Sequence, residues 1–189
     1  MRHVGACFLL LAVTAASAVA ASTGQTAHAP EPDGYWLGAV RGPVPATIAG
    51  GTVIDTAALA QLLEHGGTVL VDVAEAPHRP SGLPTGSLWL PPPHRDIAGS
   101  VWIPDVGRGA ISPGFEAWFQ KRLAALTGGN RDKRIVVYCH PRCWMSWNAA
   151  KRAINDGYRS VYWYPEGLEG WDAAGQPTWV TNPEGPDAR

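Results

Sequence analysis

Short apolar runs alternate with segments of helical pattern along this chain, and this alternation limits the folds that it can adopt. Residues 68–73 (TVLVDV) and 134–138 (RIVVY) are almost continuously apolar, as strands buried on both faces of a parallel sheet are. We expect three more short strands, at residues 52–54, 100–103 and 161–164. Helices are expected to follow strands at residues 56–63, 113–126, 146–156 and 167–174. The order predicts an α/β fold with a mostly parallel central sheet flanked by helices on both faces.

The segment 1–21 has the composition of a secretory signal peptide. Arg2 and His3 make a small basic start, residues 6–16 are apolar, and small residues follow up to Ala21, which is the pattern that precedes signal-peptidase cleavage. The apolar stretch is shorter than the ~20 residues that a spanning helix needs. We therefore expect a secreted, most simply periplasmic, protein with no membrane span in its mature form.

Composition divides the remaining chain into three parts. Residues 22–50 predict a flexible leader and an extended arm, residues 51–180 a folded domain, and residues 181–189 a polar tail. Within the domain, residues 74–96 are rich in Pro and Gly and predict a long irregular insertion. The net charge is -1 and the pI about 6.6, so the chain lacks the basic footprint of a nucleic-acid-binding protein.

Two cysteines, Cys139 and Cys143, remain once Cys7 is removed with the signal peptide. Cys139 directly follows the strand expected at residues 134–138, and a helix is expected soon after it. Backbone N–H groups and the helix dipole favour a thiolate at such a position, so Cys139 is interpreted as a nucleophile with Cys143 as its partner. A structural disulfide or two buried thiols are the alternatives. The other candidate active-site-loop residues are His140, Pro141, Arg142, Trp144, Met145 and Ser146.

Four stretches, in this order along the chain, resemble a single rhodanese domain. They are VLVDV, DIAGSVWIP, VVYC and YPEGLEGW, which begin at residues 69, 96, 136 and 164. The resemblance implies that Cys139 accepts a sulfane sulfur as a persulfide, which the N–H groups of the loop hold. It also implies a small sulfur-containing anion as the donor.

More narrowly, the chain resembles the periplasmic rhodanese-like proteins named for a CXXCW motif and for their association with PQQ-dependent alcohol catabolism. Residues 143–152 and 43–47 carry this likeness, although three residues, not two, separate Cys139 from Cys143. The likeness implies an association with a PQQ-dependent dehydrogenase system. The chain itself has no PQQ-binding or haem-binding pattern, so no cofactor is expected.

Three positions depart from the rhodanese pattern. Ala74 stands where these domains often carry an Arg, and Arg95-Asp96 replaces the usual Gly-His pair. Rhodanese-fold phosphatases, by the same resemblance, have an Arg where Met145 stands, so phosphatase activity is not expected.

The loop leaves two enzymatic interpretations open, sulfur transfer and thiol–disulfide exchange. A persulfide on Cys139 is open to attack by Cys143, which makes the pair a candidate redox-active disulfide for exchange with a periplasmic redox protein. Arg142 either attracts an anionic donor or is an exposed loop residue, and His140 either shares a proton with Cys139 or points away. Asp72, at a strand end, either orients the loop or binds backbone only.

Two non-enzymatic interpretations also remain. Cys139 and Cys143, near His140 and Met145, offer soft ligands suited to Cu(I), although no resident metal is expected. Alternatively the domain recruits a partner through its tryptophans at positions 144 and 147, if these are exposed.

Overall fold

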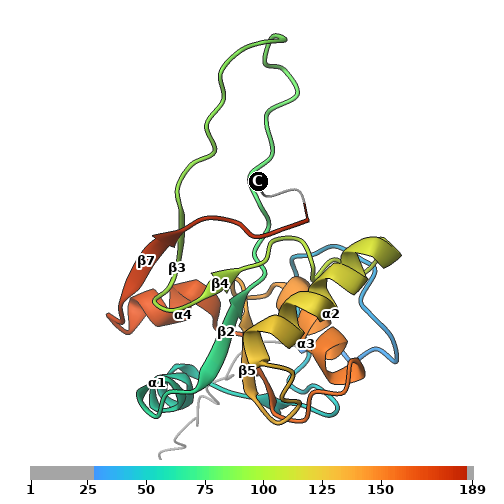
Figure 1. The fold of residues 1–189 in the computed structure, drawn as a ribbon, viewed down its shortest axis with the longest axis vertical. Helices are drawn as coiled ribbons and strands as arrows, with labels where there is room; N and C mark the ends of the chain where they lie inside the picture. Colours follow the sequence, from blue (N-terminus) through green and yellow to red (C-terminus); the bar gives the residue numbers. More distant parts are fainter. Residues whose placement is uncertain (1–27, 187–189) are drawn as a thin grey trace, which may run out of the picture.

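The computed structural model describes residues 28–186, so the expected signal peptide lies outside the described residues. Within them, a sheet of 5 strands in the order β1-β6-β5-β2-β4 is parallel throughout (Figure 1). Its strands are β1 (Thr52–Val53), β2 (Thr68–Asp72), β4 (Val101–Trp102), β5 (Arg134–Tyr138) and β6 (Val161–Tyr164). The mostly parallel central sheet that the sequence predicts is confirmed.

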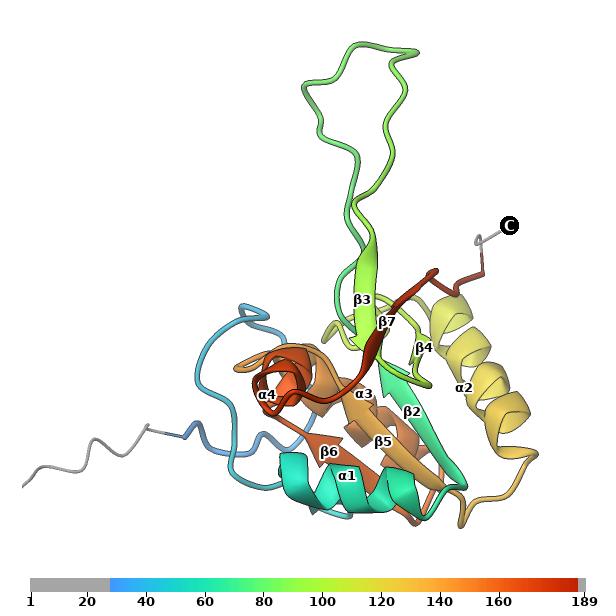
Figure 2. The same cartoon turned by 90° about the vertical axis from the view of Figure 1, so that its left-hand side faces the viewer.

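Helices cover both faces of this sheet, as expected. α2 (Pro113–Thr127) and α3 (Trp144–Asn155) lie on one face, and α1 (Thr56–Glu64) and α4 (Gly167–Ala173) lie on the other (Figure 2). Successive strand residues point to opposite faces, so Val71 packs in the cluster under α2 and α3 while its neighbour Leu70 packs under α1. This two-sided burial explains why the central strands are apolar without a break. None of the helices within residues 28–186 is long and apolar enough to cross a membrane.

Local capping sets the helix limits. The Asp55 carboxylate accepts the Ala58 N–H at 2.8 Å and starts α1, and Gly128, with φ 61°, ends α2. These are the residue types that caps favour. α3 begins at Trp144, two residues before the expected start at Ser146, because Cys143 keeps an extended backbone and is itself the N-cap.

The expected insertion does not stay irregular to Asp96. Its end forms β3 (His94–Ile97), which pairs antiparallel with β7 (Thr178–Thr181). The rest of the insertion is a long loop that rises away from the body above these two strands, and it carries the exposed Leu88 and Leu90 (Figures 1 and 2). The irregular assignment was wrong at this end because β3 is polar and is stabilised by a distant segment.

The described part of the expected tail is also held in place. Thr181 belongs to β7, and the Glu184 N–H donates to the Trp102 carbonyl at 2.8 Å. The Glu184 carboxylate pairs with the Arg122 guanidinium. The polar tail expected at residues 181–189 is therefore packed against the domain up to Glu184, since these contacts tie the chain to the sheet edge and to α2.

Candidate functional site

The cysteine loop, residues 139–143, joins the carboxyl end of β5 to the amino end of α3. Ligands of open parallel sheets meet such strand ends. Gly167, the first residue of α4, supports the loop from behind. A Cβ at this position would lie 2.5 Å from the Cys139 carbonyl oxygen, and the backbone has φ +63°. Only glycine allows this approach, which also lets the Leu168 N–H donate to the Cys139 carbonyl at 3.0 Å.

The loop turns sharply at Arg142, a non-glycine residue with φ 56°, and such a conformation is rare outside functional sites and turns. Two hydrogen bonds from outside the loop hold the turn. The Gly42 N–H donates to the Arg142 carbonyl at 3.0 Å, and the Trp144 N–H donates to the Val40 carbonyl at 2.9 Å. The turn is therefore stabilised by the segment 28–50, which we call the arm.

The arm runs along α3 and covers the cysteine loop. Asn148 of α3 accepts from the Trp36 N–H at 2.8 Å and donates to the Trp36 carbonyl at 3.0 Å. The Trp147 indole N–H donates to the Thr47 carbonyl at 3.0 Å, and the Arg152 guanidinium lies 4.0 Å from the ring centroid of Tyr35. These contacts make α3 an almost completely buried helix.

Both cysteines are free thiols and each is only 1% exposed. The Cys139 Sγ lies 3.6 Å from the His140 carbonyl oxygen and 3.8 Å from the Cys143 carbonyl oxygen, and each cysteine shifts the pKa of the other. The loop thus brings the two sulfurs together beneath the arm, in the reduced state.

The environment gives the two thiols different pKa values. The order is opposite to the expected one, since Cys139 was expected to have the lower pKa. Burial, reinforced by the neighbouring Cys143, raises the pKa of Cys139 well above its ordinary value. The hydrogen bond from Cys139, together with the N–H of Met145 and the charge of Arg41, lowers the pKa of Cys143 to about 7. Cys143, not Cys139, is the N-cap residue of α3, and this position brings it next to the Met145 N–H in the first turn, although its side chain does not cap the helix.

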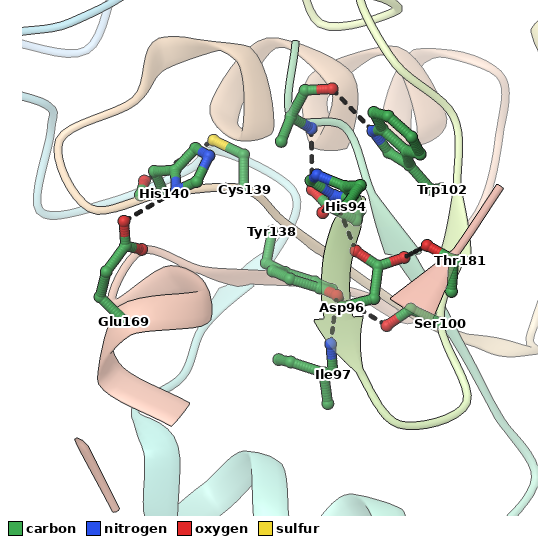
Figure 3. A network of polar contacts seen from close by, with 12 residues as sticks. His94, Asp96, Ile97, Ser100, Trp102, Tyr138, Cys139, His140, Glu169 and Thr181 are labelled. Atoms are coloured by element: carbon green, nitrogen blue, oxygen red, sulfur yellow. Dashed lines mark hydrogen bonds and ion pairs between the residues drawn. The ribbon is translucent and has the colours of Figure 1, made fainter. Parts of the chain in front are cut away.

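The other expected loop residues fall into different roles. The His140 Nδ1 lies 2.8 Å from Glu169 Oε1 on α4, so the imidazole pairs with a carboxylate instead of Cys139 (Figure 3). Arg142 is exposed. Ser146 donates to the Cys143 carbonyl at 3.1 Å and accepts from the Trp163 indole N–H at 3.0 Å, which fixes the first turn of α3.

The tryptophans of this helix do not form an exposed surface. Trp144 and Trp147 are both buried, and Trp36 of the arm stacks on Trp144. The expectation that these two rings recruit a partner is wrong, because the arm occupies the face on which they lie. The sequence predicts an extended arm that wraps the domain, with Tyr35 and Trp36 in it, but not that the arm covers these two rings.

A cavity of about 420 Å³ opens beside the loop. Its wall includes Pro141 and Arg142 of the loop, Pro43 and Val44 of the arm, and Glu166 before α4. The cavity is large enough for a small anion, and the Arg142 guanidinium is the cation that the loop presents there.

Asp72 does bind backbone, through its Oδ1, which accepts the Ala74 N–H at 2.7 Å. Its Oδ2 lies 2.7 Å from the His94 Nε2, and the same nitrogen lies 3.0 Å from Asp96 Oδ1 (Figure 3). Burial raises the pKa of Asp72 to about 8, and the two carboxylates, against the effect of burial, raise the pKa of His94 to about 9. Asp72 was expected as a possible supporting residue, whereas His94 and Asp96 carry no local signal that would place them beside it.

The sequence profile described as rhodanese-like domain matches residues 55–174, and the chain belongs to this family. The matched residues include the whole cysteine loop with β5, α3 and α4, but not the arm. No curated protein matches the chain significantly.

Three solved structures resemble the chain at low sequence identity. The rhodanese-like domain of an Anabaena protein is 18% identical, with 72% of this chain and 87% of that chain covered and a TM-score of 0.45. The polysulfide-sulfur transferase of Wolinella succinogenes is 18% identical (75% and 85% covered, TM-score 0.43), and a human single-domain sulfurtransferase is 20% identical (64% and 95% covered, TM-score 0.41).

Proposed function

We propose that this rhodanese-like protein transfers sulfane sulfur through the Cys139–Cys143 pair, with Cys143 as the ionised thiol and Cys139 as its protonated partner. The observation that carries the proposal is the position of Cys143 at the start of α3, beside the Met145 N–H and the charge of Arg41, both of which lower its pKa together with Cys139. A thiolate is the form of cysteine that attacks sulfur. The rhodanese resemblance assigns the attack to Cys139, whose raised pKa disfavours it.

The first step would use a thiosulfate-type anion. The Cys143 thiolate attacks the outer sulfur of the donor, the donor S–S bond breaks, and sulfite leaves with the electron pair. A persulfide then stands on Cys143, and a thiolate acceptor takes its outer sulfur and restores the Cys143 thiolate. Arg142, at the wall of the adjoining cavity, supplies a positive charge that attracts the anionic donor.

The contact between the two thiols favours thiol–disulfide exchange as a second candidate function. Cys139 loses its proton and attacks the inner sulfur of the Cys143 persulfide, and hydrosulfide leaves as the Cys139–Cys143 disulfide forms. A periplasmic dithiol protein would then reduce this disulfide and reset the pair.

Mass spectrometry of protein incubated with thiosulfate, without reductant, tests both functions. We expect a gain of about 32 Da, one sulfur atom on a cysteine, in the Cys139→Ser variant and no gain in Cys143→Ser. A wild-type mass lower by two hydrogens after incubation would support closure of the disulfide. If instead Cys143→Ser takes up sulfur and Cys139→Ser does not, the order of the two roles proposed above is wrong.

The proposed setting is the periplasm, beside a PQQ-dependent dehydrogenase system. The signal-peptide composition of residues 1–21 and the likeness to the CXXCW proteins support it. Fractionation of a bacterium that expresses the full chain tests the location, since the periplasmic extract should then contain a chain shortened near Ala21. A full-length chain in the cytoplasm would contradict it.

A Cu(I) site at the two sulfurs is the remaining alternative. Glu169 binds the Nδ1 of His140, so Nε2 is the ring nitrogen that this interpretation would use. Copper that copurifies with the wild type but not with either cysteine variant would favour it over sulfur transfer.

A further inference from the structure

A second cluster of reactive side chains lies at the base of the long insertion, where β2 ends against β3. Asp72 closes β2, and His94 and Asp96 stand on β3 with one residue between them. One potential ligand atom from each of these three residues lies within 4.8 Å of the other two. Figure 3 shows the His94 imidazole turned toward the Asp96 carboxylate.

The cluster has one more carboxylate oxygen than its hydrogen bonds can satisfy. The His94 Nε2 is 2.7 Å from Asp72 Oδ2 and 3.0 Å from Asp96 Oδ1, and the single hydrogen on this nitrogen is used by Asp72. Asp96 is completely buried, and its Oδ1 has no hydrogen-bond partner. An unpaired buried carboxylate oxygen is costly unless a cation meets it. The protonated His94 ring, 3.0 Å away, fills this role in the free protein, and a metal ion would take the place of its proton.

Neighbouring groups hold each of the three side chains in this orientation. Ala74 N–H binds the other oxygen of Asp72 at 2.7 Å, and the Thr181 hydroxyl binds the other oxygen of Asp96 at 2.6 Å. The His94 ring stacks on Trp102 with centroids 3.8 Å apart, and the Trp102 indole N–H donates to the Ala74 carbonyl at 2.8 Å. Supporting bonds of this kind fix the side chains of metal sites.

We propose that Asp72, His94 and Asp96 bind a divalent transition-metal ion, Zn²⁺ being the best match, through Nε2 and one oxygen of each carboxylate. Zinc binds imidazole nitrogen and carboxylate oxygen at about 2.0–2.2 Å. The present separations of 2.7 and 3.0 Å need to widen by about 0.3–0.8 Å for the ligand atoms of a tetrahedral ion. A nitrogen ligand distinguishes the site from those that Mg²⁺ or Ca²⁺ prefer.

The fourth position of the ion would face a cavity. A hollow of about 300 Å³, lined in part by His94, Trp102, Pro93 and Thr181, adjoins the cluster and gives the metal a way in. Three protein ligands with one open position are typical of zinc sites that bind water or a substrate. The site is separate from the cysteine pair and does not depend on the sulfur-transfer proposal.

The other acidic cluster of the described residues provides a contrast. Glu75, His78 and Asp105 also come close together, but they are largely exposed and Arg108 pairs with both carboxylates. An arginine there already supplies the cation. His78→Gln is therefore a matched control for His94→Gln.

Isothermal titration calorimetry of the chelator-treated protein with Zn²⁺ tests the proposal. The background is the Cys139→Ser/Cys143→Ser double variant, so that thiols cannot bind the metal. We expect one equivalent of bound Zn²⁺, an affinity at least about 100-fold lower in His94→Gln, no change in His78→Gln, and a loss of about 10-fold in Thr181→Val. Mg²⁺ should not compete at similar concentrations.

A measurement on the unmutated cluster guards against misfolded variants. Zn²⁺ that binds the folded state should raise the Tm of the cysteine-free protein in a concentration-dependent way. Co²⁺ bound there should show a tetrahedral spectrum without a sulfur charge-transfer band. The proposal would be overturned if Zn²⁺ did not bind stoichiometrically and left the Tm unchanged. It would also be overturned if His94→Gln left the binding intact.

Discussion

Trp36 of the arm stacks on Trp144, the first residue of α3, with ring centroids 4.4 Å apart and ring planes inclined by 11°. Trp144 directly follows Cys143, and its N–H is bound by Val40 of the same arm. The stack therefore holds the arm over the Cys143 thiol, which is 1% exposed. Access of reagents and substrates to Cys143 depends on how firmly this cover is attached.

We predict that Trp36→Ala increases the rate at which Cys143 is alkylated by iodoacetamide. Loss of an aromatic pair weakens the attachment of the arm by about 1 kcal/mol, which corresponds to a rate roughly 5-fold higher if opening limits the reaction. Leu37→Ala is the control, since Leu37 is 75% exposed. Equal rates in both variants would show that the arm does not limit access.

The acidity of Cys143 predicts a pH dependence. Because its pKa is lowered to about 7, the thiolate is present above this pH and is lost as the pH falls through it, so the alkylation rate should fall with an apparent pKa near 7. Cys139→Ala removes the hydrogen bond that contributes most to the lowering, and the apparent pKa should rise. Cys139→Ser keeps a donor and should shift it less; an unchanged value in Cys139→Ala would contradict the assignment.

Gly167 should tolerate no side chain. Gly167→Ala places a Cβ 2.5 Å from the Cys139 carbonyl oxygen at φ +63°, so we expect a loss of about 2–4 kcal/mol in the free energy of unfolding, from backbone strain and overpacking together. Gly175→Ala has a similar φ of +68° but nothing within 4 Å, and should lose only about 1 kcal/mol. Urea unfolding of both variants checks the difference. Equal losses of unfolding free energy would show that the cysteine loop moves to accommodate the Cβ at no cost.

Asn148 should be the main polar tie between α3 and the arm. It accepts the Trp36 N–H and donates to the Trp36 and Gly107 carbonyls, and it is buried. Asn148→Ala leaves these groups unpaired, so we expect a loss of about 2–4 kcal/mol in unfolding free energy. Asn155→Ala, which breaks one exposed hydrogen bond to Tyr35, should cost less than about 1 kcal/mol; similar values for the two would refute the role of Asn148.

Patterns local to a few residues determined the elements of the central sheet. The apolar runs at β2 and β5 predicted buried parallel strands, since only strands covered on both faces lack polar alternation. Asp55, and Gly128 after the last turn, indicated where α1 begins and α2 ends, because caps act through adjacent backbone groups. The position of Cys139 at the end of β5, and with it the place of the site, followed from the same reasoning.

Contacts between distant segments decided the rest, and no local pattern encodes them. β3 is polar and exists through its pairing with β7, which lies more than 80 residues further on. The arm buries Trp144 and Trp147, whereas the sequence of the helix alone is compatible with exposed or buried rings at these positions. The pKa of Cys143 is lowered because Cys139, the Met145 N–H and Arg41 surround it, and the pKa of a thiol depends on the three-dimensional environment of the sulfur rather than on its sequence neighbours. Asp72 likewise meets His94 and Asp96 only because the end of β2 and the strand after the insertion lie side by side in the folded chain.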